Sequence, residues 1–252
     1  MKHKLTYAEK EARNPAHLPR HYYPGYVFIP KNGYFQARKV GLTGLRVCRD
    51  PRFHKTRLLA KEFARSNTWA KLIRAAAYKA TGIKCNKQSL HGLLIRALQQ
   101  DDVNFYGSRQ LQLGDLSLLE GFNFNAKLPL EDTCKLQYEG AYDPEVQQVI
   151  ISLPSFVPEY FLFPPAPVTH CRICLVTIAI DLLNGSYDAT IARTSLMPLK
   201  RVNIPARELI TPCKTLKDTI NITALGLSCY RQQKHGLSAS PGCSPLEVIG
   251  VC

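Results

Sequence analysis

The sequence lacks a long hydrophobic run, because no stretch approaches the ~18 consecutive apolar residues that a membrane-spanning helix requires. No apolar core follows the basic residues at its start, so we expect no signal peptide. Apolar residues make up 45% and charged residues 21%, which is typical of globular domains and argues against disorder. We therefore expect a folded protein of the cytoplasm, or of an assembled particle, without membrane insertion.

Sequence motifs of catalysis are also missing. The sequence has no glycine-rich phosphate loop, no Gly-x-Ser-x-Gly elbow and no His-Glu-x-x-His zinc pattern. Acidic residues are scarce where the cations are dense, which excludes the carboxylate cluster of a metal-dependent nuclease from that region. We therefore predict that the protein is not an enzyme and requires no cofactor.

The cysteine pattern matches neither a zinc finger nor a disulfide framework. The nine cysteines are odd in number and widely spaced. Cys171 and Cys174 form a Cys-x-x-Cys sequence without a second pair at zinc spacing, and in a strand they would point to opposite faces. We predict no metal site and expect most cysteines to be small buried hydrophobic side chains. The pattern leaves open whether any of them are oxidised.

Negative charge is scarce in the first part of the chain. Residues 1–100 hold 21 lysines and arginines against four acidic residues, a net charge of +17. Residues 101–252 hold 12 against 15, a net charge of −3. The whole chain carries +14, so its excess of cations lies in the first two-fifths. Such asymmetry is typical of a chain with a polyanionic partner.

Residues 26–39 have the pattern of a β-hairpin. Asn32-Gly33 stands between two apolar and aromatic runs, which predicts a type I′ turn. Pairing outward from this turn places Lys31 opposite Tyr34. The preceding residues 1–25 contain three prolines and no apolar periodicity, so we expect a basic arm there.

The segment after the hairpin predicts helices. Asp50 followed by Pro51 is typical of a helix start, with the aspartate as N-cap. The apolar stripes before and after Asn67 lie roughly 140° apart on a helical projection, so we expect a break near this residue. The second helix should end near Ala80, and a third is predicted for residues 86–100.

From about residue 128 the hydrophobic period changes to two, which predicts β-strands. Short strands separated by turns that contain proline and glycine favour an antiparallel β-sandwich of immunoglobulin-like architecture. The predicted fold class is α+β, with a basic arm and hairpin (1–48), a helical region of about three helices (49–126) and the β-sandwich (127–252). The predicted strands are residues 133–139, 146–153, 169–181, 185–194, 219–231 and 246–252.

Four sequence stretches resemble landmarks of a family of bacterial proteins of similar length. They are DPRFHKTRLLAKEF, LLEGFNFN, PAPVTHCRICLVTIAID and ALGLSCYRQQ. The resemblance covers roughly residues 26–252 and implies a basic N-terminal hairpin, a helical middle and a β-rich C-terminal half. It implies no activity, cofactor or site residue.

The charge pattern leads to a first functional hypothesis, the non-catalytic binding of a polyanion, in particular nucleic acid. Densely spaced guanidinium and ammonium groups neutralise phosphates without reading sequence. Three tyrosines are candidates for stacking on unpaired bases. The predicted phosphate-binding residues are Arg38, Lys39, Arg46, Arg49, Arg52, Lys55, Arg57, Lys61 and Arg65, and the stacking candidates are Tyr22, Tyr23 and Tyr34.

A second hypothesis is a structural subunit of a phage-like or surface particle. A basic arm and a hairpin edge are common in subunits that add strands to their neighbours. The protein would then be a homo-oligomer or part of a larger assembly, with the arm and hairpin making the subunit contacts. The sequence does not decide between DNA, RNA and an acidic protein as the partner.

Overall fold

The computed structural model describes residues 26–31, 34–39, 41–83, 85, 87–214, 218–234 and 236–251. For residues 27–31, 34–39 and 87–89 it describes the backbone only. The chain forms two compact units, Met1–Arg57 and Leu58–Cys252, and each is treated separately. The arm and the Asn32-Gly33 turn that the sequence predicts lie outside the described residues.

The first unit contains the predicted hairpin. Strands β1 (Tyr26–Lys31) and β2 (Tyr34–Lys39) pair antiparallel, with Lys31 opposite Tyr34 as the sequence indicates. A short helix α2 (Gly44–Arg49) and a 3-10 turn η2 (Pro51–Phe53) follow. The Asp50 side chain caps η2 by accepting a hydrogen bond from the Arg52 amide, which confirms the predicted cap.

Helix α3 (His54–Thr81) is continuous for 28 residues, so the prediction of a break near Asn67 is wrong. The two apolar stripes are not both buried, since Phe63 of the first stripe is 58% exposed. Instead the second stripe continues towards the N-terminus of the helix, where its members are the buried polar residues Glu62 and Ser66. Its members are Glu62, Ser66, Trp69, Ala70, Ile73, Ala76 and Ala77. The helix ends at Thr81, close to the predicted end near Ala80, and the following Gly82 has a φ of +76°, in the left-handed region.

The other helical elements are shorter. The helix predicted at residues 86–100 is α4 (Lys87–Gln99), and its leucines at 90, 94 and 98 are buried. The remaining helical turns are η3 (Leu111–Leu113), η4 (Leu116–Leu119), α5 (Leu130–Thr133), α6 (Pro158–Phe161) and η5 (Pro241–Cys243).

Two antiparallel sheets make up the β-rich part. The larger sheet has the order β10-β9-β5-β6, with β11 also paired to β9 and β7 to β5, and the smaller has the order β3-β4-β8. The strands of the larger sheet are β5 (His170–Asp181), β6 (Tyr187–Arg193), β7 (Met197–Pro198), β9 (Thr219–Gln233), β10 (Gly236–Ala239) and β11 (Leu246–Val251). Those of the smaller sheet are β3 (Glu139–Asp143), β4 (Gln148–Leu153) and β8 (Arg207–Pro212).

The structure confirms a mixed α+β chain with antiparallel sheets, while the immunoglobulin-like sandwich stays a prediction. The strand predicted at 133–139 is misplaced, because Thr133 ends α5 and β3 begins only at Glu139. Strands β7, β8 and β10 were not predicted from the sequence. The other predicted strands correspond to β4, β5, β6, β9 and β11.

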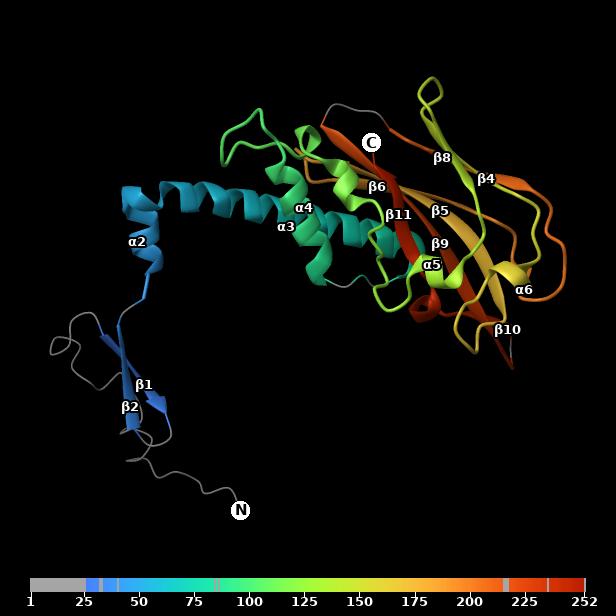
Figure 1. Cartoon of the computed structure of the whole chain (residues 1–252), viewed down its shortest axis with the longest axis horizontal. Coiled ribbons are helices and arrows are strands. Elements are labelled where there is room, and N and C mark those ends of the chain that lie inside the picture. Colours follow the sequence, from blue (N-terminus) through green and yellow to red (C-terminus); the bar gives the residue numbers. More distant parts are fainter. Residues whose placement is uncertain are drawn as a thin grey trace, which may run out of the picture. The chain divides into compact units, whose positions relative to one another are not determined.

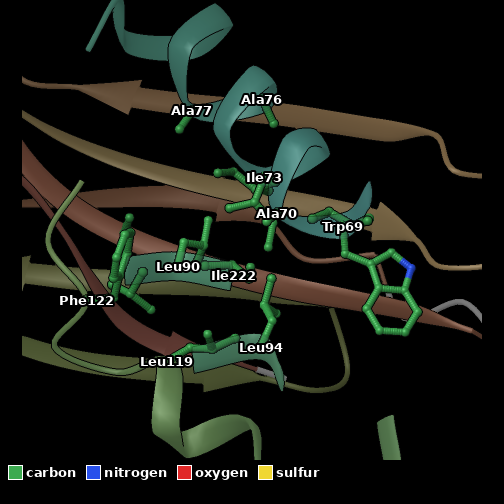
Figure 2. Packing of buried hydrophobic residues seen from close by; sticks show 14 of the residues in the cluster. Trp69, Ala70, Ile73, Ala76, Ala77, Leu90, Leu94, Leu119, Phe122 and Ile222 are labelled. Carbon is green, nitrogen blue, oxygen red and sulfur yellow. The ribbon is translucent and has the colours of Figure 1, made fainter. Parts of the chain in front are cut away.

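The alternation of side chains along β5 creates two hydrophobic clusters, one on each face of the larger sheet. Val176 and Ile178 join the cluster that contains residues of α3 and α4. Figure 1 shows the ribbons of α3 and α4 beside the larger sheet. Ile173 and Leu175 join the cluster that contains β4 and β8. Figure 2 shows the first cluster from close by, where Ile73 of α3 lies among side chains of α4 and β9.

We expect Ile73→Ala to lower the free energy of unfolding by about 2–5 kcal/mol, because the side chain is fully buried and its removal leaves a cavity. Urea unfolding followed by circular dichroism measures the change. Ile210→Ala is the matched control, since Ile210 is 45% exposed and its loss should cost much less. Equal effects of the two substitutions would contradict the assigned core.

Candidate nucleic-acid interface

The first unit carries a strong positive charge. Residues 1–57 contain 13 lysines and arginines against three acidic residues, a net charge of +10. Asp50 is the one acidic residue between positions 26 and 57. The cations of this unit that can be placed with their side chains lie at the corner formed by α2, η2 and the start of α3, which we call the basic corner (residues 41–57).

Hydrogen bonds within the chain fix the basic corner. The Thr43 side chain caps α2 by accepting from the Arg46 amide at 3.3 Å. Arg57 donates its Nη1 to the carbonyls of Val47 at 2.6 Å and Asp50 at 3.0 Å. Val47 lies in the last turn of α2, where a helix leaves its carbonyl acceptors unsatisfied, and Asp50 is the C-cap that follows it. The predicted phosphate ligand Arg57 is therefore engaged in holding the corner together.

Asp50 organises the arginines around it. Arg52 donates Nη2 to its Oδ2 at 2.9 Å, and Arg46 Nε lies 3.8 Å from the same oxygen. The side-chain hydrogen bond from Arg52 is the largest cause that lowers the pKa of Asp50. Both arginines remain accessible, with side chains that are 58% (Arg46) and 76% (Arg52) exposed. Ion pairs at the surface contribute little to stability, so a phosphate can replace the carboxylate as partner.

The basic corner presents its remaining cations to solvent. Arg49 and Lys55 are exposed, and no residue of α2 is buried. Four predicted site residues therefore lie on the surface of one short, capped segment. They are Arg46, Arg49, Arg52 and Lys55.

The last two predicted cations, Lys61 and Arg65, belong to the second unit. Lys61 is exposed on α3. Arg65 is partly buried, and its Nη2 donates to the carbonyls of Gly107 at 3.2 Å and Arg109 at 2.9 Å. Its guanidinium also lies 5.9 Å from the ring centroid of Trp69. Arg65 thus anchors the loop of residues 101–110 to α3.

The other predicted site residues cannot be placed in this way. Tyr22 and Tyr23 lie outside the described residues. Tyr34, Arg38 and Lys39 belong to β2, for which the backbone alone is described. Their predicted roles in stacking and phosphate contact stay predictions.

The sequence reasoning missed the role of two buried carboxylates. Glu62 is 2% exposed and accepts a hydrogen bond from the Gly107 amide at 2.7 Å, while Arg109 Nη1 lies 3.9 Å from its second oxygen. Gly107 has a φ of +90°, and a Cβ there would lie 2.8 Å from Leu58 Cδ2, so glycine is required. The sequence signal for the burial of Glu62 was its spacing: it lies four residues before Ser66 and seven before Trp69, and so on the same face of the helix.

Asp101 fixes the other end of the same loop. Its carboxylate accepts from the amides of Val103 at 2.9 Å and Gln110 at 2.7 Å, and it also receives two hydrogen bonds from Asn104. Burial acts to raise the pKa of Asp101, but these hydrogen bonds outweigh it and lower the pKa. The loop is therefore held in one conformation from both ends.

Comparisons with known proteins add no assignment: no family model matches the chain, and neither a curated protein nor a solved structure matches it. In the described part of the chain, no three His, Cys, Asp or Glu side chains are grouped so that they could hold a metal ion. Among the helices that the structure describes, none has the length and apolar character needed to cross a bilayer.

We expect Asp101→Asn to lower the free energy of unfolding at pH 7 by about 2 kcal/mol, because an amide nitrogen cannot accept the bonds that the carboxylate accepts. The folded-state pKa of Asp101 is lowered, so its stabilisation is present above the unfolded-state pKa near ~4 and disappears as the pH falls through the folded value. The difference in the free energy of unfolding between the wild type and the variant should therefore become smaller at acidic pH. Urea unfolding at several pH values measures it.

Asp102→Asn provides the control, because Asp102 is the exposed neighbour of the buried aspartate. It should leave the free energy of unfolding nearly unchanged at pH 7. A loss in this variant as large as that of Asp101→Asn would show that the loop is not held by the buried carboxylate.

Proposed function

We propose that the protein binds a polyanion, and specifically the phosphate backbone of a nucleic acid, through the basic corner. The observation that supports this function is the group of four exposed cations on a segment whose backbone is capped from within. Asp50 is the single acidic residue there, and its surface pairs are weak enough to exchange for phosphate. Binding of this type positions a protein on nucleic acid without reading its sequence.

Arginine predominates in the basic corner, which agrees with phosphate as the partner. A guanidinium group binds two phosphate oxygens at once and keeps its charge at any physiological pH. The internal bonds of Arg57 keep the ends of α2 and η2 together, so the exposed arginines sit on an ordered backbone. An ordered site loses less conformational entropy on binding than a flexible segment would.

We expect log affinity for an oligonucleotide to fall with log salt at a slope of roughly −4 to −5, as for contacts to about five phosphates. Fluorescence anisotropy of a labelled oligonucleotide across a salt series measures the slope. Replacing Arg46, Arg49, Arg52 and Lys55 together by glutamine should make the slope shallower by about 3 to 4, because each lost contact removes about 0.9.

The matched control replaces four exposed lysines of the second unit by glutamine and removes the same formal charge. These are Lys127, Lys135, Lys200 and Lys234. The control should retain most of the salt dependence. An equal loss of salt dependence in both variants would show that binding depends on net charge alone. An absence of binding by the wild-type protein at low salt would exclude the proposed function.

One observation favours the second hypothesis, an assembly subunit. Val103 is 76% and Phe105 is 89% exposed, although the loop that carries them is fixed by buried carboxylates. A fixed apolar projection is typical of a contact with another protein, because little entropy is lost when it docks. Self-association through this loop is compatible with polyanion binding by the basic corner.

We expect an assembly of this kind to dissociate in Phe105→Ser, because the substitution removes the largest exposed apolar side chain of the loop. Size-exclusion chromatography with light scattering over a concentration series gives the oligomeric state. Phe163→Ser is the control, since Phe163 is also exposed, at 50%, but lies outside the loop. A wild-type protein that is monomeric at all concentrations would exclude the assembly function.

A further inference from the structure

Two cysteine side chains face each other across the larger sheet. Cys171 of β5 and Cys229 of β9 are directly opposite in the antiparallel register. Their Sγ atoms are 3.9 Å apart, although the residues are 58 positions apart in the chain. Both are buried, and each belongs to the hydrophobic cluster shared with β4 and β8. This contact separates the pair from the cysteines that act only as small apolar side chains.

The hydrogen-bond pattern shows which type of cross-strand pair this is. The Cys229 amide donates to Ser244 Oγ at 3.0 Å, and its carbonyl accepts from the Ser240 amide at 2.8 Å. The backbone polar groups of Cys229 therefore point away from β5, and Cys171 is its non-hydrogen-bonded partner. Such partners have Cα atoms about 4.5 Å apart, within the range of about 4.4–6.8 Å that disulfides span. We therefore expect rotation of the side chains, without movement of the strands, to bring the two sulfur atoms into bonding distance.

The two thiols differ in acidity. The hydrogen bond between them lowers the pKa of Cys229 and raises that of Cys171. When the pair loses one proton, the remaining thiol can donate a hydrogen bond to the neighbouring thiolate across the 3.9 Å between the two sulfur atoms. A thiolate is the nucleophilic form of cysteine, so the deprotonated member of the pair is the residue that reacts first.

We propose that Cys171 and Cys229 are a reversible oxidation site that a peroxide converts to an intramolecular disulfide. The thiolate of one of the two cysteines attacks one peroxide oxygen, the O–O bond breaks, and the leaving hydroxide takes up a proton to become water. The thiol sulfur of the other cysteine then attacks the sulfenic sulfur, the S–O bond breaks, and the leaving hydroxyl group takes up the thiol proton to become a second water. Two electrons pass from the two sulfurs to the peroxide.

The same geometry makes the bond reducible. The Cα separation of a non-hydrogen-bonded pair lies at the short end of the disulfide range, and bonds at the limits of this range are strained and more easily reduced. Once formed, the bond joins β5 to β9 and closes a chain segment of 58 positions. Closing a long segment restricts the unfolded chain, so the oxidised protein should resist denaturation more strongly.

In the test, the folded full-length protein is treated with hydrogen peroxide. It is then denatured in the presence of an alkylating agent that blocks the free thiols, and its peptides are mapped without reductant. We expect one linked peptide pair that contains Cys171 and Cys229, and its disappearance after incubation with dithiothreitol. The oxidised protein should also unfold at a higher urea concentration than the reduced one. A free-thiol count should show a loss of two thiols per chain.

Two variants sharpen the result. Cys171→Ala should abolish the link, whereas Cys174→Ala should retain it, because Cys174 is equally buried in β5 but lies on the opposite side of the strand. Sulfinic acid without a link would overturn the proposal, and so would a link to Cys134 or Cys243, which pack against the same cluster. The peptide map of the wild-type protein decides these cases even where a variant does not fold.

Discussion

The packing of one stripe of α3 against a face of β5 and β9 is the contact on which the rest of the structure depends. The stripe runs from Glu62 to Ala77, so the helix must remain continuous through Asn67 for all of it to reach the core. A buried carboxylate at one end of this stripe would be costly without partners. The Gly107 amide and Arg109 supply them, and the loop of residues 101–110 is thereby fixed to the same helix.

The sequence allowed the elements with strong local signals to be predicted. The sequence Asn32-Gly33 predicted the pairing of Lys31 with Tyr34, Asp50 and Pro51 marked a helix start, and the apolar alternation of residues 169–181 identified β5. Prediction failed where tertiary contacts overrode the apolar pattern. The continuity of α3 depends on the burial of Glu62 and Ser66, which a hydrophobic pattern counts as solvent-facing. Strand β8 has half of its side chains exposed in alternation with buried ones, and it was missed because its apolar pattern is short.

The candidate site was predictable to a similar degree. Charge density alone pointed to the basic corner, and Arg46, Arg49 and Arg52 lie on its surface. Arg57 and Arg65 could not be distinguished from them, because a guanidinium that binds backbone carbonyls has the same sequence signature as one that faces solvent. The structure separates the two kinds by their partners, since each of these two arginines donates to a pair of carbonyl oxygens. Density of charge therefore overestimates the number of cations at a surface.

The loop of residues 101–110 has a consequence for proteolysis. Phe105 is a preferred residue for chymotrypsin-like proteases, and its 89% exposure places it within reach of them. A protease binds its substrate as an extended strand, however, and exposed loops are cut where their backbone is free of internal hydrogen bonds. The amides of Val103, Gly107 and Gln110 are held by Asp101 and Glu62. Cleavage at Phe105 must therefore wait for local opening of the loop, and its rate reports how often these two carboxylates release their donors.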